Sequence, residues 1–126
     1  METLYSQGEG NDLNREFAKA LKNQNYTRAA WIAQVQNRPK EEIRALQEKA
    51  LKQYIVEYRN AQAVQTLIEE YHFSNAELQH LVQSILQQMR NEQAAGKNVA
   101  KSQFDIETMR FLKLDEWIES YVKPRR

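Results

Sequence analysis

YTRAAW at residues 26–31 and FSNAEL at residues 73–78 are two copies of one short pattern. In each copy an aromatic residue precedes a hydroxyl residue, and a large apolar residue follows four positions after the hydroxyl. A hydroxyl side chain at the start of a helix accepts hydrogen bonds from backbone N–H groups that have no partner within the helix. We therefore predict that Thr27 and Ser74 are the N-caps of two helices.

Apolar residues on either side of each cap extend the pattern. In the second copy Phe73 and Leu78 form a hydrophobic staple across the cap, and Glu77 completes a capping box with Ser74. In the first copy Tyr26 is expected to pack on Trp31, which makes Trp31 a predicted core residue. The apolar residues that precede the two copies also align. Each copy is therefore predicted to be a helix, a tight turn and a second helix.

The rest of the chain completes an all-α fold. Three glycines and two prolines leave few positions for turns, and apolar residues recur at helical spacing. We predict a disordered N-terminus over residues 1–10, a helical core domain over 11–93, a linker over 94–103, a C-terminal docking segment over 104–122 and a basic tail over 123–126. The core domain consists of two αα-hairpins joined through a long helix, and the C-terminal helical segment packs across them.

The number of helices over residues 39–71 stays open, and the start of the last helix depends on one capping residue. No glycine or proline follows Pro39 before Tyr71, so residues 39–71 could form one helix or two. The repeat favours a break near Asn60, because the first copy begins with a separate helix at the equivalent place. In the C-terminal segment Asp115 is the predicted N-cap of the last helix.

Catalytic and metal-binding patterns are missing from the sequence. There is no cysteine, which excludes a disulfide framework and a thiolate metal site. The two histidines, His72 and His80, lack the i, i+4 spacing of a helical metal site. No apolar run approaches the ~20 residues of a membrane span, and no secretory signal is visible. We expect a soluble cytoplasmic protein that is not an enzyme, does not bind a membrane and carries no cofactor or metal.

The predicted function is protein–protein interaction, because a catalytic set is missing, the candidate recognition helix carries little charge, and helical hairpins present grooves. The C-terminal segment supplies the candidate contacts. It is rich in large apolar side chains, which must be covered by the parent domain, by a second copy or by another protein. The protein is accordingly expected to be a monomer or a segment-exchanged homodimer with a protein partner. The candidate partner-binding residues are Phe104, Met109, Phe111, Trp117 and Tyr121.

The alternative function is DNA binding, because residues 66–83 resemble a helix-turn-helix. In that interpretation Asn75, Gln79 and Gln83 read bases, since glutamine and asparagine pair with adenine. Phosphate contacts come from Arg15, Lys19 and Lys22, which share one face of the first helix. Against it, residues 75–88 contain no lysine or arginine, although phosphate contacts dominate DNA affinity.

Overall fold

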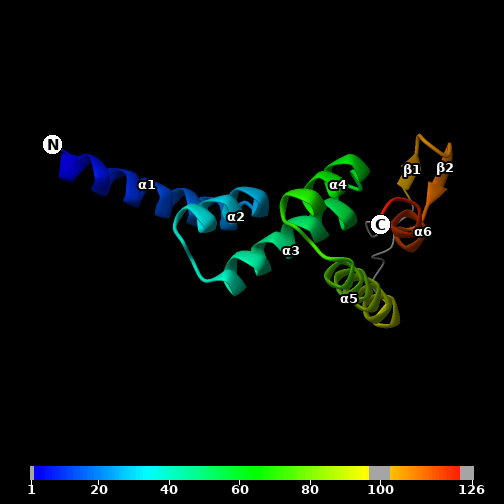
Figure 1. The fold of residues 1–126 in the computed structure, drawn as a ribbon. Coiled ribbons are helices and arrows are strands. Elements are labelled where there is room, and N and C mark those ends of the chain that lie inside the picture. The colour runs from blue at the N-terminus through cyan, green and yellow to red at the C-terminus, as the bar shows by residue number, and fades with distance from the viewer. Residues whose placement is uncertain (1, 97–102, 123–126) are drawn as a thin grey trace. The chain divides into compact units, whose positions relative to one another are not determined.

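The computed structural model describes residues 2–96 and 103–122 of the chain. The described residues form six helices: α1 (Glu2–Lys22), α2 (Tyr26–Val35), α3 (Lys40–Val56), α4 (Ala61–Glu70), α5 (Asn75–Ala94) and α6 (Leu114–Tyr121). Two short strands, β1 (Gln103–Asp105) and β2 (Arg110–Leu112), pair in antiparallel fashion. The predicted all-α class is confirmed (Figure 1).

Residues 39–71 form two helices, with the break where the repeat indicated it. Helix α3 ends at Val56, and the Asn60 side chain caps α4 by accepting from the Ala63 N–H at 3.1 Å. Arg59, just before the cap, has a φ of 48°. A left-handed residue stops a helix, and an asparagine cap starts the next one, so the chain needs neither glycine nor proline here.

The first and last helices of the predicted core domain begin and end at other residues than expected. Helix α1 begins at Glu2, within the stretch that was predicted to be disordered. Once a helix has nucleated, each added residue costs little, so α1 continues backwards through a polar stretch. Helix α5 ends at Ala94, one residue into the predicted linker, and Gly96 follows at a φ of 81°. Most of the predicted linker and the whole basic tail lie outside the described residues.

The chain divides into two compact units, where the sequence analysis expected one core over residues 11–93. The first unit covers residues 1–50 and the second covers residues 51–126, so the boundary lies within α3. Each unit has its own cluster of buried apolar side chains. The helical spacing of apolar residues identifies the buried face of a helix, but it does not reveal which helices share a core.

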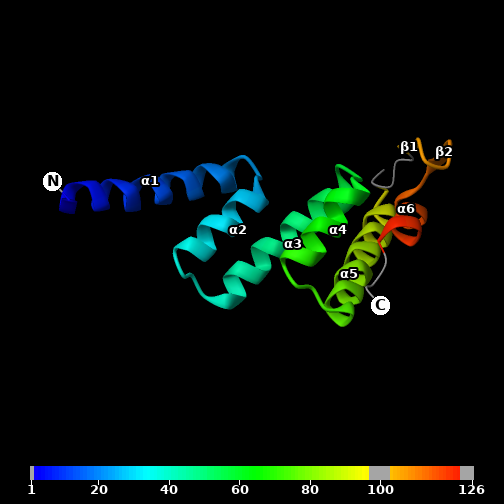
Figure 2. The ribbon, with the colours of Figure 1, turned by 45° about the horizontal axis from the view of Figure 1, so that its top comes forward.

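In the first unit α2 turns back along α1 (Figure 2). Arg28 of α2 donates to the Glu16 carboxylate at 2.7 Å, and Gln36 donates to Asn14 at 2.8 Å. Small side chains let the two helices approach closely, so alanine dominates this core. Its buried residues are Phe17, Ala20, Ala29, Ala30, Ile32, Ala33 and Leu46.

The predicted cap of α2 was wrong by two residues. Asn25 is the N-cap, accepting from the Arg28 N–H at 3.3 Å, while the Thr27 hydroxyl only donates to the Asn25 side chain. With the cap at Asn25, Trp31 is the sixth residue after the cap and not the fourth. Two residues of an α-helix correspond to a rotation of roughly 200°, so Trp31 does not occupy the staple position predicted for it. Trp31 is therefore 49% exposed, and Ile32 takes the buried position in its place.

In the second unit the predicted cap of α5 is confirmed. The Ser74 hydroxyl accepts from the Glu77 N–H at 3.1 Å, and the Glu77 carboxylate accepts from the Ser74 N–H at 3.0 Å. Phe73 and Leu78 are both buried in the core of this unit, as a hydrophobic staple requires. The buried core residues of the second unit are Leu51, Ile55, Val64, Leu67, Ile68, Phe73, Leu78, Leu81, Ile85, Met89, Leu112, Leu114, Trp117, Ile118 and Val122.

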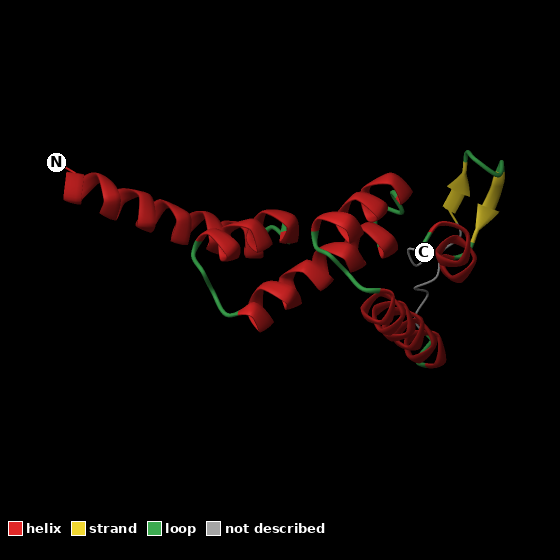
Figure 3. Ribbon diagram, in the orientation of Figure 1, coloured by secondary structure: helices red, strands yellow, loops and turns green. Residues whose placement is uncertain are grey.

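The C-terminal segment packs on the second unit, but it is only partly helical. Residues 103–112 form a β-hairpin, and α6 follows at once (Figure 3). The N-cap of α6 is Lys113, whose N–H donates to the Glu116 carboxylate at 3.0 Å; the predicted cap, Asp115, lies in the first turn. The buried apolar side chains of the segment come from the end of β2 and from α6 with the residue after it, whereas those of β1, the turn and Phe111 are exposed.

Candidate functional site

An exposed apolar surface covers the β1–β2 hairpin. Its four residues, Phe104, Ile106, Met109 and Phe111, are exposed by 49%, 79%, 70% and 68%; we call them the hairpin surface. Phe104 lies opposite Phe111 in the strand pair, and their ring centroids are 5.2 Å apart in an edge-to-face arrangement. Four large exposed apolar side chains within eight residues, two of them in ring contact, are the kind of surface that marks interaction sites.

The hairpin is held from its base. Next to the exposed Phe111, Leu112 is 2% exposed and packs in the core, and its carbonyl accepts from Arg59 at 3.0 Å. The Tyr121 hydroxyl donates to the Asp105 carboxylate at 2.6 Å, so α6 holds β1. A surface held in this way loses little conformational entropy when it binds.

The Asp105 carboxylate is the centre of the hairpin's hydrogen bonds. Besides Tyr121, it accepts from the Thr108 N–H at 3.0 Å and from the Thr108 hydroxyl at 2.7 Å. These donors favour the charged form, and the Tyr121 bond above all lowers the pKa of Asp105. The same bond raises the pKa of Tyr121 to about 12. At a pH between the pKa of Asp105 and the pKa of Tyr121, the carboxylate is ionised and the phenol is protonated. Both groups can then form the hydrogen bonds that hold the hairpin turn.

Three of the five predicted partner-binding residues, Phe104, Met109 and Phe111, lie on the hairpin surface. Trp117 does not, because it is only 4% exposed and packs in the core of the second unit. Tyr121 is half-buried and holds the hairpin through Asp105. The number of apolar residues in the segment does not show which of them contact solvent and which pack in the core. That depends on which residues form a strand and which form a helix.

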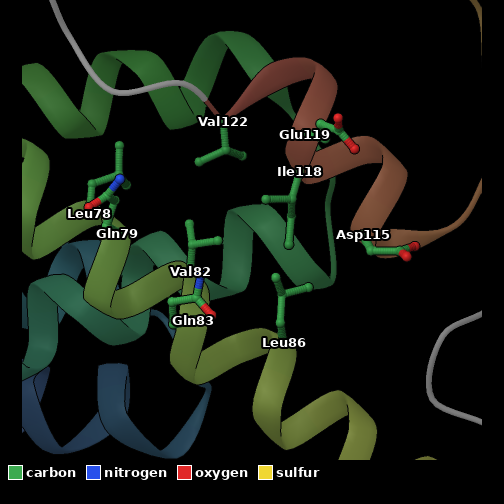
Figure 4. A pocket seen from close by; sticks show the side chains of 9 residues that line it. All are labelled: Leu78, Gln79, Val82, Gln83, Leu86, Asp115, Ile118, Glu119 and Val122. Carbon is green, nitrogen blue, oxygen red and sulfur yellow. The ribbon is translucent and has the colours of Figure 1, made fainter.

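A groove with a volume of about 450 Å³ runs between α5 and α6, also in the second unit. In Figure 4 the side chains of Val82 and Leu86 on α5 point toward Ile118 and Val122 on the other wall. Apolar side chains thus form its floor, and polar ones form its two rims. The lining residues are Leu78, Gln79, Val82, Gln83, Leu86, Asp115, Ile118, Glu119 and Val122.

The rims of this groove differ in charge. The α6 rim carries two exposed carboxylates, Asp115 and Glu119, spaced one helical turn apart. The α5 rim carries the amides Gln79 and Gln83 at the same spacing. Among the described residues neither carboxylate forms an ion pair. The groove is therefore apolar within and acidic along one edge.

The residues of the alternative DNA-binding interpretation fall into two sets. Asn75, Gln79 and Gln83 are exposed on α5, and His72 in the preceding turn has a φ of 55°. Two of these three, Gln79 and Gln83, line the groove opposite the α6 carboxylates. The basic residues Arg15, Lys19 and Lys22 are exposed on α1 and belong to the other unit.

Several residues of these surfaces escaped the sequence analysis. Ile106 lies on the hairpin surface, and Asp115 and Glu119 form the acidic rim. The i, i+4 spacing of the two carboxylates on one helix was a usable signal for a charged edge. In the first unit, no sequence signal indicated that Trp31 is exposed, because its predicted position depended on a cap at Thr27.

The described part of the chain holds no group of three or more histidine, aspartate and glutamate side chains arranged for a metal ion. Among the described residues, no helix is long and apolar enough to cross a membrane. No family model matches the chain, and comparisons with curated proteins and with solved structures found no significant match.

Proposed function

We propose that this protein is a non-enzymatic binding module that docks on a protein partner through its hairpin surface. The observation that carries the proposal is the exposure of Phe104, Ile106, Met109 and Phe111 on a hairpin that is fixed to the core. Exposed aromatic and methionine side chains are enriched at protein interfaces. A partner with an apolar cleft could receive the hairpin tip with little ordering cost.

Charge at the hairpin favours a protein over a lipid surface as the partner. Glu107 lies in the turn between Ile106 and Met109, and Asp105 follows Phe104 directly. Insertion of the tip into a bilayer would carry the Glu107 carboxylate toward hydrocarbon at a considerable cost. A protein cleft can offer that carboxylate a hydrogen-bond donor while it covers the apolar residues.

The DNA-binding alternative has weaker support. The carboxylates of Asp115 and Glu119 lie across the groove from Gln79 and Gln83, where they would repel a phosphate backbone. The α5 residues from Asn75 to Gln88 contain no lysine or arginine to compensate. Protein binding therefore needs fewer additional assumptions than DNA binding.

Affinity capture with a matched pair of variants tests the proposal. The hairpin variant is Ile106→Ser with Phe111→Ser, and the control is Trp31→Ser with Val35→Ser, which removes exposed apolar residues from α2. We expect wild type and control to retain a common protein from the native cell extract, and the hairpin variant to lose it. Equal retention by all three proteins would contradict the proposal.

Two further measurements separate the rival partners. Co-sedimentation with anionic vesicles that depends on Phe111 would favour a membrane partner. Salt-sensitive binding to a mixed-sequence duplex at ~50 mM salt, lost when Arg15, Lys19 and Lys22 are changed to Glu, would favour the DNA-binding alternative. Absence of both, together with the capture result above, supports a protein partner.

A further inference from the structure

We infer that the groove between α5 and α6 is a second docking site, which takes a basic amphipathic helix from a protein partner. The site is separate from the hairpin surface and does not depend on the function proposed for it. Its floor is apolar, formed by residues such as Val82, Leu86 and Ile118, and its α6 rim carries two carboxylates. These two features together select the occupant.

The apolar floor calls for a helix rather than an extended peptide. Val82 and Leu86 are half-buried and one turn apart on α5, facing Ile118 and Val122 across the groove (Figure 4). Helices that bind in grooves insert apolar anchors at i, i+3 or i+4, and i+7, which matches a floor built from residues one turn apart. The floor offers no strand edge for a peptide to extend, because both walls are helical.

The rims decide the charge of the occupant. Asp115 and Glu119 are spaced by four residues along α6, about 6 Å, so lysine or arginine residues one turn apart on a bound helix could face both carboxylates. The opposite rim is neutral, and its Gln79 and Gln83 amides can donate to or accept from a polar side chain. Among residues 2–96 and 103–122, no lysine or arginine lines the groove to repel such an occupant.

Fluorescence anisotropy with the full chain tests this inference. The probe is a labelled synthetic helix of leucine at the i, i+3, i+4 and i+7 positions and lysine elsewhere, and the control probe has glutamate in place of lysine. We expect the lysine peptide to bind and the glutamate peptide not to bind. Because two partly solvated charge pairs are involved, Asp115→Asn with Glu119→Gln should weaken binding roughly threefold to thirtyfold.

A matched charge variant shows whether the effect is local. Glu57→Gln with Glu70→Gln makes the same change in net charge on exposed residues of the second unit that do not line the groove. This control should bind the lysine peptide as wild type does. Equal weakening in both variants, or equal binding of both peptides, would overturn the inference. Binding that appears only after removal of residues 123–126 would also overturn it, in favour of the chain's own basic tail as the occupant.

Discussion

Neighbouring residues of β2 should respond to substitution in opposite ways. Phe111 is 68% exposed and Leu112 is 2% exposed, because successive strand residues point to opposite faces. Leu112→Ala should reduce the free energy of unfolding of the second unit by about 2–5 kcal/mol, through lost burial and a residual cavity. That is a large share of the stability of a small domain.

Phe111→Ala should leave the fold almost intact. Its ring is mostly in solvent, and the main loss is the edge-to-face pair with Phe104, whose centroid lies 5.2 Å away. Such pairs contribute about 0.5–1.5 kcal/mol, and alanine also fits a strand less well than phenylalanine. We therefore expect a cost of about 1 kcal/mol, together with loss of partner capture.

Urea denaturation followed by tryptophan fluorescence can measure both effects. Trp117 is buried in the core of the second unit, and Trp31 is the other tryptophan of the chain, so the variants are made in a Trp31→Phe background. The midpoint should fall far more for Leu112→Ala than for Phe111→Ala, at an unchanged slope. Equal shifts for the two variants would refute the alternation of faces on β2, and with it the hairpin surface.

Three other predictions concern caps, buried faces and pH. In urea denaturation Ser74→Ala should cost about 1 kcal/mol, and Asn25→Ala should cost more than Thr27→Ala, because Asn25 is the cap. Ile32→Ala should destabilise the first unit by about 2–5 kcal/mol, clearly more than Trp31→Ala. Hairpin order, followed by amide NMR signals, should fall as the pH drops from 3.8 through the lowered pKa of Asp105, since the stability from that shift is complete only above 3.8. It should fall again as the pH rises from 10.0 through about 12, since the stability from the raised pKa of Tyr121 is complete only below 10.0. Tyr121→Phe should remove this alkaline arm and reduce the acid arm, where the Thr108 bonds to Asp105 remain.

The parts of the fold that local chemistry determines could be predicted from the sequence. Ser74 and Glu77 form a capping box, a pattern specific to the start of a helix, and α5 begins where this pattern predicted it. The break near Asn60 was predicted because the first copy of the repeat begins with a separate helix at the equivalent place. The first copy misled, because Asn25 and Thr27 are both good caps and only packing of the alanine-rich face decides between them.

The candidate site was predictable only in part, for reasons of geometry. Phe104, Met109 and Phe111 stood out by their apolar character, but whether they face a core or solvent depends on a strand pairing that the short run 103–112 does not specify. The groove arises where α6 meets α5, two helices far apart in the sequence. A single sequence read by local periodicity contains no information on that contact.

Photocrosslinking in the native cell can capture the contact that we propose between the hairpin surface and a protein partner. Phe111 is replaced by p-benzoylphenylalanine in the native cell, and Gln87, an exposed residue of α5 outside the groove, is replaced in the same way as the control. We expect a discrete crosslinked protein from position 111 that is absent from position 87. A crosslink of the same intensity from both positions, or none from position 111, would contradict it.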